Sequence, residues 1–291
     1  MRIFIAGCGE IGRRVAKLWQ GRGAEVAALA RSEGSARELV RLGIETVLGD
    51  LDDPGSIGTL PVQGCILYYL APPPEKGEGD PRIAAFLAAI PTGAGPERIV
   101  YMSTTGVYGD RQGGWVTEDT PPAPTSSRGK RRLAAETALR AWGLAREVPV
   151  IILRVAGIYG PGRIPVERVR SGAPVPAEEE APASNRIHAQ DVARACVAAA
   201  LHGKDGSVYN VSDGNPGTIT QYYNAVADLL GIPRPPAVPM EEARRVLGKG
   251  ILSFLAESKR VDSRKLREEL GLELLYPDLS SGLPASLEDE Q

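Results

Sequence analysis

The sequence has few residues of the kinds that build metal sites and disulfide frameworks. Three cysteines and two histidines are spread over 291 residues. Cys8, Cys65 and Cys196 are odd in number and lack metal-ligand spacing, so we expect no metal site and three buried thiols in a reducing cytosol. A strong charge of one sign is also missing, because the formal net charge is −2. Neither nucleic acid nor an anionic membrane surface is therefore expected as a partner.

Long apolar runs are missing as well. No run approaches the roughly 18 residues that a membrane-spanning helix requires. The first residues lack the charged and apolar regions of a secretory signal, and we expect a soluble cytoplasmic protein. Glycine and proline number 34 and 24, which indicates many loops in a folded chain and not a low-complexity chain.

Short apolar segments alternate with amphipathic helical patterns in the first half of the chain. The expected strands lie near residues 2–6, 25–29, 44–48, 64–70, 98–102 and 149–154. The alternation predicts an α/β fold with a Rossmann-type, doubly wound parallel sheet, whose ligands bind at the carboxyl ends of the strands. We assign residues 1–162 and 187–212 to this domain, and residues 163–186 and 213–291 to a smaller C-terminal substrate lobe. Residues 280–291 are expected to form a frayed tail.

The first expected strand runs straight into three glycines. Gly7 suits a sharp turn, Gly9 lets a diphosphate approach the backbone, and Gly12 lets the next helix pack closely on the strand. The start of that helix presents free N–H groups to the phosphates. The pattern predicts a dinucleotide site that includes Glu10 and Ile11 of the same turn.

Cofactor preference depends on the end of the second strand. An acidic residue about 20 residues past the glycines would hold a ribose 2′-hydroxyl and favour NAD. Arg31 and Ser32 stand at that place. Because a guanidinium suits the 2′-phosphate, we expect NADP in preference to NAD. A solvated loop arginine is the alternative.

Further segments, taken in order, resemble the extended short-chain dehydrogenase/reductase superfamily, which contains nucleotide-sugar epimerases and dehydratases. Beyond the glycine turn they are residues 49–51, 103–109, 153–162, 186–192, 208–211 and 258–261. The resemblance implies that Asp50 and Leu51 border the adenine, although Asp50 could equally cap the turn that follows it. By their place after the fourth strand, Leu70, Ala71 and Pro72 are also expected at the cofactor.

The catalytic positions depart from the pattern of this family. Active members carry a Ser or Thr, and then a Tyr with a Lys four residues later. Thr104 matches the first position, but Arg128 and Arg132 stand at the Tyr and Lys positions. A guanidinium stays protonated near neutral pH, so Arg128 cannot act as an acid or a base. The usual proton donor is therefore missing.

For three other features the sequence allows both a functional and a structural interpretation. Tyr108 and Tyr159 could replace the proton donor because both follow strand ends, or they could be packed tyrosines. The basic run 128–132 opens a helix, where positive charge is unfavourable, so it indicates either a bound anion or a solvated face paired with Glu136. His188 is expected to be a structural residue ahead of a helix rather than a base.

These observations favour an NAD(P)-dependent enzyme related to nucleotide-sugar epimerases and dehydratases, with altered proton-transfer residues and a small-molecule substrate such as a nucleotide sugar. A catalytically silent dinucleotide-binding scaffold or redox sensor is the alternative, because the Tyr and Lys are missing. A homodimer is expected by analogy with the family alone.

Overall fold

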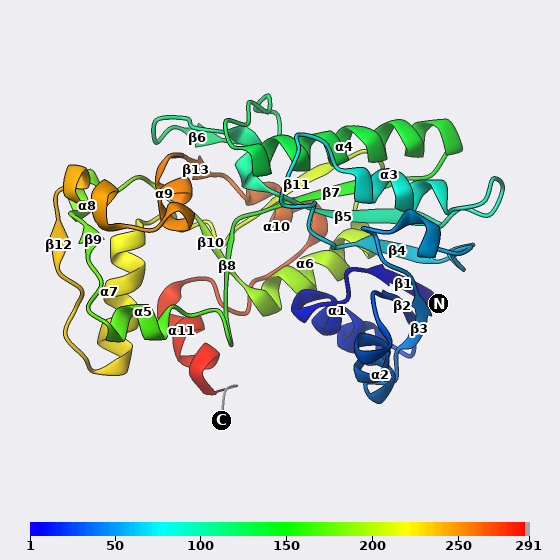
Figure 1. Ribbon diagram of the computed structural model, residues 1–291, viewed down its shortest axis with the longest axis horizontal. Coiled ribbons are helices and arrows are strands. Elements are labelled where there is room, and N and C mark those ends of the chain that lie inside the picture. Colours follow the sequence, from blue (N-terminus) through cyan, green and yellow to red (C-terminus); the bar gives the residue numbers. More distant parts are fainter. Residues whose placement is uncertain (289–291) are drawn as a thin grey trace.

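A parallel sheet of seven strands forms the centre of the larger part of the protein. The computed structural model describes residues 1–288 and gives the strand order β11-β7-β5-β4-β1-β2-β3 (Figure 1). The doubly wound sheet expected from the sequence is confirmed. Its strands are β1 (Arg2–Ala6), β2 (Glu25–Ala30), β3 (Glu45–Leu48), β4 (Ile66–Tyr69), β5 (Arg98–Thr104), β7 (Val150–Val155) and β11 (Val208–Val211). The order reverses between β1 and β4, where such sheets bind their ligands.

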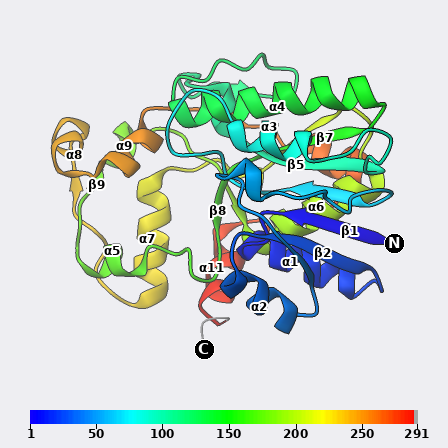
Figure 2. The same cartoon turned by 45° about the vertical axis from the view of Figure 1, so that its right-hand side comes forward.

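Helices cover both faces of this sheet. One core joins the sheet to α1, α6 and α10, and the other joins it to α3 and α4 (Figures 1 and 2). The helices of these two cores are α1 (Glu10–Gln20), α3 (Pro81–Ala88), α4 (Ser127–Arg146), α6 (Ala189–His202) and α10 (Arg264–Leu270). Helix α2 (Glu33–Arg41) lies between β2 and β3 in the chain. Leu266 and Leu270 pack in the first core, although their segment was assigned to the smaller lobe. The division into lobes otherwise stays a prediction.

A second cluster of helices lies beyond the carboxyl ends of β5 and β7, around its own apolar core. Tyr159, Tyr222, Tyr223 and Leu283 are buried in that core. The helices are α5 (Val166–Arg170), α7 (Ile219–Leu230), α8 (Met240–Val246), α9 (Lys249–Leu255) and α11 (Leu279–Glu288). Three short strand pairs complete the structure: β8 (Gly157–Tyr159) with β10 (Arg186–His188), β6 (Trp115–Val116) with β13 (Arg260–Val261), and β9 (Val175–Pro176) with β12 (Ala237–Val238). The last pair lies within this second cluster (Figure 1).

The expected frayed tail is wrong for the described residues 280–288. They form most of α11 (Figure 1), which Asp278 caps by accepting a hydrogen bond from the Ser281 N–H at 2.8 Å. Leu283 is only 3% exposed, because Gly282 lets the helix lie against the ring of Tyr159. A single buried leucine and a close glycine therefore hold a segment whose composition is typical of a tail. Residues 289–291 lie outside the described residues.

In the part of the chain that the structure describes, no helix combines the length and the apolar character needed to cross a membrane.

Candidate functional site

Two of the three glycines of the first turn, Gly7 and Gly12, have the role predicted from the sequence, and the binding role of Gly9 stays a prediction. Gly7 has φ +89°, and a side chain there would collide with the backbone of Ala71. A Cβ on Gly12 would lie 2.9 Å from Gly7 O, so the helix packs closely on the turn. A Cβ on Gly9 would meet no atom within 4 Å. Gly9 therefore faces an open space at the start of α1, where backbone N–H groups are free to bind an anion.

This space fits the diphosphate of a dinucleotide. No side chain caps α1 at Gly9, so the first N–H groups of the helix have no competing side-chain acceptor. Ile11 is buried in the core below, whereas Glu10 pairs with Arg14 and with Arg163. The turn thus combines a smooth backbone cradle with two nearby guanidinium groups.

The end of β2 carries the residues expected to select the cofactor. Ser32 caps α2, with Ser35 N–H donating to its Oγ at 3.3 Å. Arg31 is exposed and lies near Asp52. The pKa of Asp52 is lowered mainly by a hydrogen bond from Arg82 and also by the charge of Arg31. Arg31 is therefore an exposed cation at this end of the sheet, close to the Asp52 carboxylate.

The ends of β3 and β4 come next along the chain, and the end of β4 lies at the reversal of the strand order. Asp50 Oδ1 accepts from the Asp52 N–H at 2.9 Å, so Asp50 caps the turn that follows it, which is the alternative role given for it above. Leu51 packs against the core. Leu70 N–H donates to Ala6 O at 2.8 Å, which prolongs the pairing of β4 with β1. The carbonyls of Ala71 and Pro72 accept hydrogen bonds from Arg132 and Arg82.

A pocket of about 700 Å³ opens at the ends of strands β5 and β7. Its sheet-side wall comes from the ends of β5 and β7 and from the start of α4. Its opposite wall comes from β8, β10, α7 and residues 255–259. The pocket contains three of the predicted catalytic residues, namely Thr104, Arg128 and Arg132. Thr104 Oγ1 also accepts from the Gly106 N–H at 3.2 Å, which orients its hydroxyl group.

The basic run 128–132 divides into residues with different partners. Lys130 pairs with Glu78 at 3.0 Å, and Arg131 donates to Gly77 O at 2.9 Å, so these two hold the loop that precedes α3. Arg132 is buried and donates to the carbonyls of Ala71 and Met102, at 3.3 and 2.8 Å, and thereby joins the ends of β4 and β5. Neither of the two interpretations of the run accounts for all of it.

Of the two loop tyrosines, only Tyr159 lines the pocket. Tyr108 is fully buried, and its hydroxyl donates to Asn210 Oδ1 at 2.7 Å. Burial raises the pKa of Tyr108 above its usual value, so it is the packed tyrosine that the alternative described. Tyr159 donates to Asp278 O at 3.1 Å, and burial raises its pKa as well.

Sequence reasoning missed an ion pair in the pocket wall. Lys259 Nζ donates to Glu257 Oε2 at 2.7 Å and to Gly109 O at 2.8 Å. The two side chains are 7% and 10% exposed. A Cβ on Gly106 would lie 3.5 Å from Thr104 Oγ1 and 4.0 Å from Glu257 Oε2, so the hydroxyl and the carboxylate face one small space. The resemblance marked residues 258–261, but no local signal identified the carboxylate.

The wall opposite the sheet carries a second cationic side chain besides Lys259, namely Arg186 of β10. The Arg186 guanidinium lies over the Tyr222 ring, 4.1 Å from its centroid, and donates to Thr218 O at 3.4 Å. Burial lowers the pKa of Arg186. A desolvated guanidinium stacked on an aromatic ring is a favourable partner for an anion.

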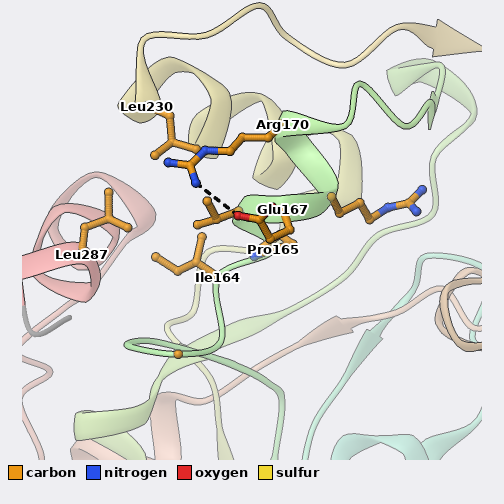
Figure 3. A pocket seen from close by; sticks show the side chains of 9 residues that line it. Ile164, Pro165, Glu167, Arg170, Leu230 and Leu287 are labelled. Carbon is orange, nitrogen blue, oxygen red and sulfur yellow. Dashed lines mark hydrogen bonds and ion pairs between the residues drawn. The ribbon is translucent and has the colours of Figure 1, made fainter.

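Other candidate sites in the described chain carry less chemistry. His188 is buried and caps α6 by accepting from the Gln190 N–H at 3.2 Å, as expected of a structural residue. Among residues 1–288, His, Cys, Asp and Glu side chains form no group of three that could hold a metal ion. A hollow of about 420 Å³ lies between α5, α7 and α11, lined by Ile164, Leu230 and Leu287 beside the Arg170–Glu167 pair (Figure 3). No residue at the carboxyl ends of the seven-stranded sheet lines this hollow.

Comparisons with known proteins agree with this geometry. The profile of the NAD dependent epimerase/dehydratase family matches residues 82–212. Protein YeeZ of Escherichia coli is 30% identical, over 95% of this chain and 97% of that protein.

Solved structures share the fold over the full length. A functionally unknown conserved protein from Silicibacter pomeroyi is 31% identical with a TM-score of 0.82, over 100% of this chain and 99% of that one. The UDP-glucose 4-epimerase of Thermotoga maritima, solved with UDP-glucose, is 20% identical with a TM-score of 0.78, over 99% and 98% of the two chains. The order of the seven strands, the glycine turn and these matches agree, and the chain belongs to the NAD dependent epimerase/dehydratase family.

Proposed function

We propose that the protein is an NADP-preferring oxidoreductase or epimerase that acts on a nucleotide sugar. The observation that carries this proposal is the pocket at the ends of β5 and β7, where Thr104, Arg128 and the Glu257–Lys259 pair meet. Arg163, which lines the pocket, pairs with Glu10 of the glycine turn, where a Cβ on Gly9 would meet no atom within 4 Å. Cationic side chains on both walls suit an anionic substrate, and the fold relative from Thermotoga maritima was solved with UDP-glucose.

The cofactor would be held by the glycine turn, by Arg31 and by Asp50 with Leu51. When bound, its nicotinamide would supply the hydride acceptor and donor. The chain supplies the proton chemistry: Thr104 holds a substrate hydroxyl, and Glu257 accepts its proton. Lys259 holds the Glu257 carboxylate in place, because its ammonium lies 2.7 Å from a carboxylate oxygen. Arg128 and Arg132 bind anionic parts of the ligands and take no part in proton transfer.

A binding titration with NADPH and with NADH tests the cofactor site. Gly9→Val places its Cβ where no protein atom lies within 4 Å, so the variant should stay folded and lose both cofactors. Gly248→Val is the matched control, because Gly248 also precedes a helix with nothing within 4 Å of its Cβ position. Wild-type protein that binds neither cofactor would overturn the proposal.

Turnover of UDP- and dTDP-hexoses, followed by chromatography of the products, tests the enzymatic part. An epimer, a dehydrated sugar or an oxidised sugar supports an enzyme. Cofactor binding with no product from any of these sugars would favour the catalytically silent scaffold or redox sensor, which remains the second candidate because no tyrosine stands between Tyr108 and Tyr159.

A further inference from the structure

Arg163 links the start of the smaller lobe to the glycine turn. Its Nε donates to Glu10 Oε2, and Arg14 Nε donates to the other carboxylate oxygen, Oε1, at 3.1 Å. Glu10 is the first residue of α1 and directly follows Gly9. A guanidinium that is 153 residues away from Glu10 in the sequence is therefore held beside the open space of the turn.

The loop that carries Arg163 is anchored on both sides. Tyr159 before it and Ile164 after it pack in the core of the smaller lobe, and the Arg163 N–H closes a turn on Gly160 O at 3.0 Å. Arg163 also lines the 700 Å³ pocket. The same side chain thus borders both the pocket and the glycine turn.

The charges around Glu10 favour an additional anion. A carboxylate beside the turn would repel a diphosphate, but two guanidinium groups face it. The side chains of Arg163 and Glu10 are 41% and 32% exposed, and an ion pair this accessible to water contributes little to stability. Exchange of the Glu10 carboxylate for a phosphate therefore costs little, and a guanidinium binds phosphate through paired hydrogen bonds.

We propose that Arg163 is a cofactor-binding residue, contributed by the smaller lobe, that releases Glu10 and binds the diphosphate of the dinucleotide. The inference rests on the proposed function, because it requires a dinucleotide in the glycine turn. It assigns opposite effects to the two partners of one ion pair: Arg163 strengthens cofactor binding, and Glu10 weakens it.

Equilibrium titrations of the full chain test this assignment with three probes: NADPH, NADH and adenosine 2′,5′-bisphosphate, which has no diphosphate. Arg163→Met should raise the Kd of NADPH and of NADH by about tenfold each, since one charge-assisted contact is lost. Its Kd for adenosine 2′,5′-bisphosphate should stay within twofold of wild type. Glu10→Gln should lower the Kd of NADPH. Arg170→Met, which removes an exposed ion pair with Glu167 in the same lobe, is the matched control.

The outcomes separate this inference from the proposed function. Wild-type protein that binds neither NADPH nor NADH would overturn both. If the wild type binds and Arg163→Met stays within twofold for NADPH, the proposed function stands and the assignment of Arg163 fails. The assignment also fails if Arg163→Met and Glu10→Gln shift the Kd in the same direction, which a purely structural ion pair would produce. The assignment would also be overturned if Arg163→Met raised the Kd of adenosine 2′,5′-bisphosphate as much as that of NADPH.

Discussion

The glycine turn of the sheet and the far wall of the pocket are built in different ways. On the sheet side, Gly7, Gly9 and Gly12 form a turn of backbone with almost no side chains. The far side carries charged side chains, Arg163, Arg186 and Glu257 among them, brought together from three separate segments. A backbone cradle leaves a short local motif in the sequence, whereas an assembled wall leaves none. The comparison predicts that damage to the sheet side affects folding and cofactor binding, and that damage to the far side, Arg163 excepted, affects chemistry.

The largest effect is expected where the sheet side does contain a buried charge. Glu136 accepts from Ser103 Oγ at 2.5 Å and from Arg154 Nη2 at 2.8 Å, and both members of the ion pair are almost fully buried. Glu136→Ala leaves the Arg154 guanidinium buried without its carboxylate, which should lower the free energy of unfolding by about 3–5 kcal/mol. Urea unfolding measures this loss. Glu269→Ala, at the more exposed pair with Lys204, should cost less than about 1 kcal/mol; equal losses would contradict the argument.

The next effect belongs to the far side and should appear in turnover, not in stability. Glu257→Gln removes the proposed proton acceptor and keeps the shape of the side chain. With a nucleotide sugar that the wild type converts, kcat should fall by about 100-fold or more, roughly 3 kcal/mol in the barrier. The Kd for NADPH should stay unchanged. Glu269→Gln is the matched control at a second glutamate–lysine pair. A kcat within threefold of wild type for Glu257→Gln would remove this residue from the chemistry.

What the sequence could predict follows the same division. The strand positions and the steric roles of Gly7 and Gly12 were predictable, because strand period and backbone sterics act over a few residues. The position of the Glu257–Lys259 pair beside Gly109 was not, since it depends on β13 lying beside β6, which brings residues far apart in the chain to the end of β5. The basic run 128–132 shows the limit: its charges were evident, but only the fold decides that Lys130 and Arg131 bind the loop before α3.

The pH dependence of stability extends the comparison, because an ionisable group, Asp213, is buried behind the far wall. Burial raises the pKa of Asp213 from its usual value to about 7, and its N–H donates to Arg186 O at 2.8 Å. The native state therefore binds a proton that the unfolded chain has lost, and stability falls as the pH rises from 5 to 8, by on the order of 2 kcal/mol. Asp213→Asn should remove this slope and be more stable than wild type at pH 8. Urea unfolding at several pH values measures this. If the free energy of unfolding changed with pH in the same way for Asp213→Asn and the wild type, the assignment to Asp213 would be wrong.

The smallest effect tests whether the sheet side relies on a side chain at all. Arg31 is exposed beside Asp52, and it is the group expected to prefer a 2′-phosphate. Arg31→Asp should raise the Kd of NADPH by about tenfold, roughly 1.4 kcal/mol, and lower that of NADH, because a carboxylate accepts from the ribose hydroxyl and repels the phosphate. Fluorescence titration measures both. Arg37→Asp, at an exposed arginine on α2, is the control. Unchanged NADPH affinity in Arg31→Asp would mean that the backbone cradle alone holds this cofactor, and that the preference for NADP has another source.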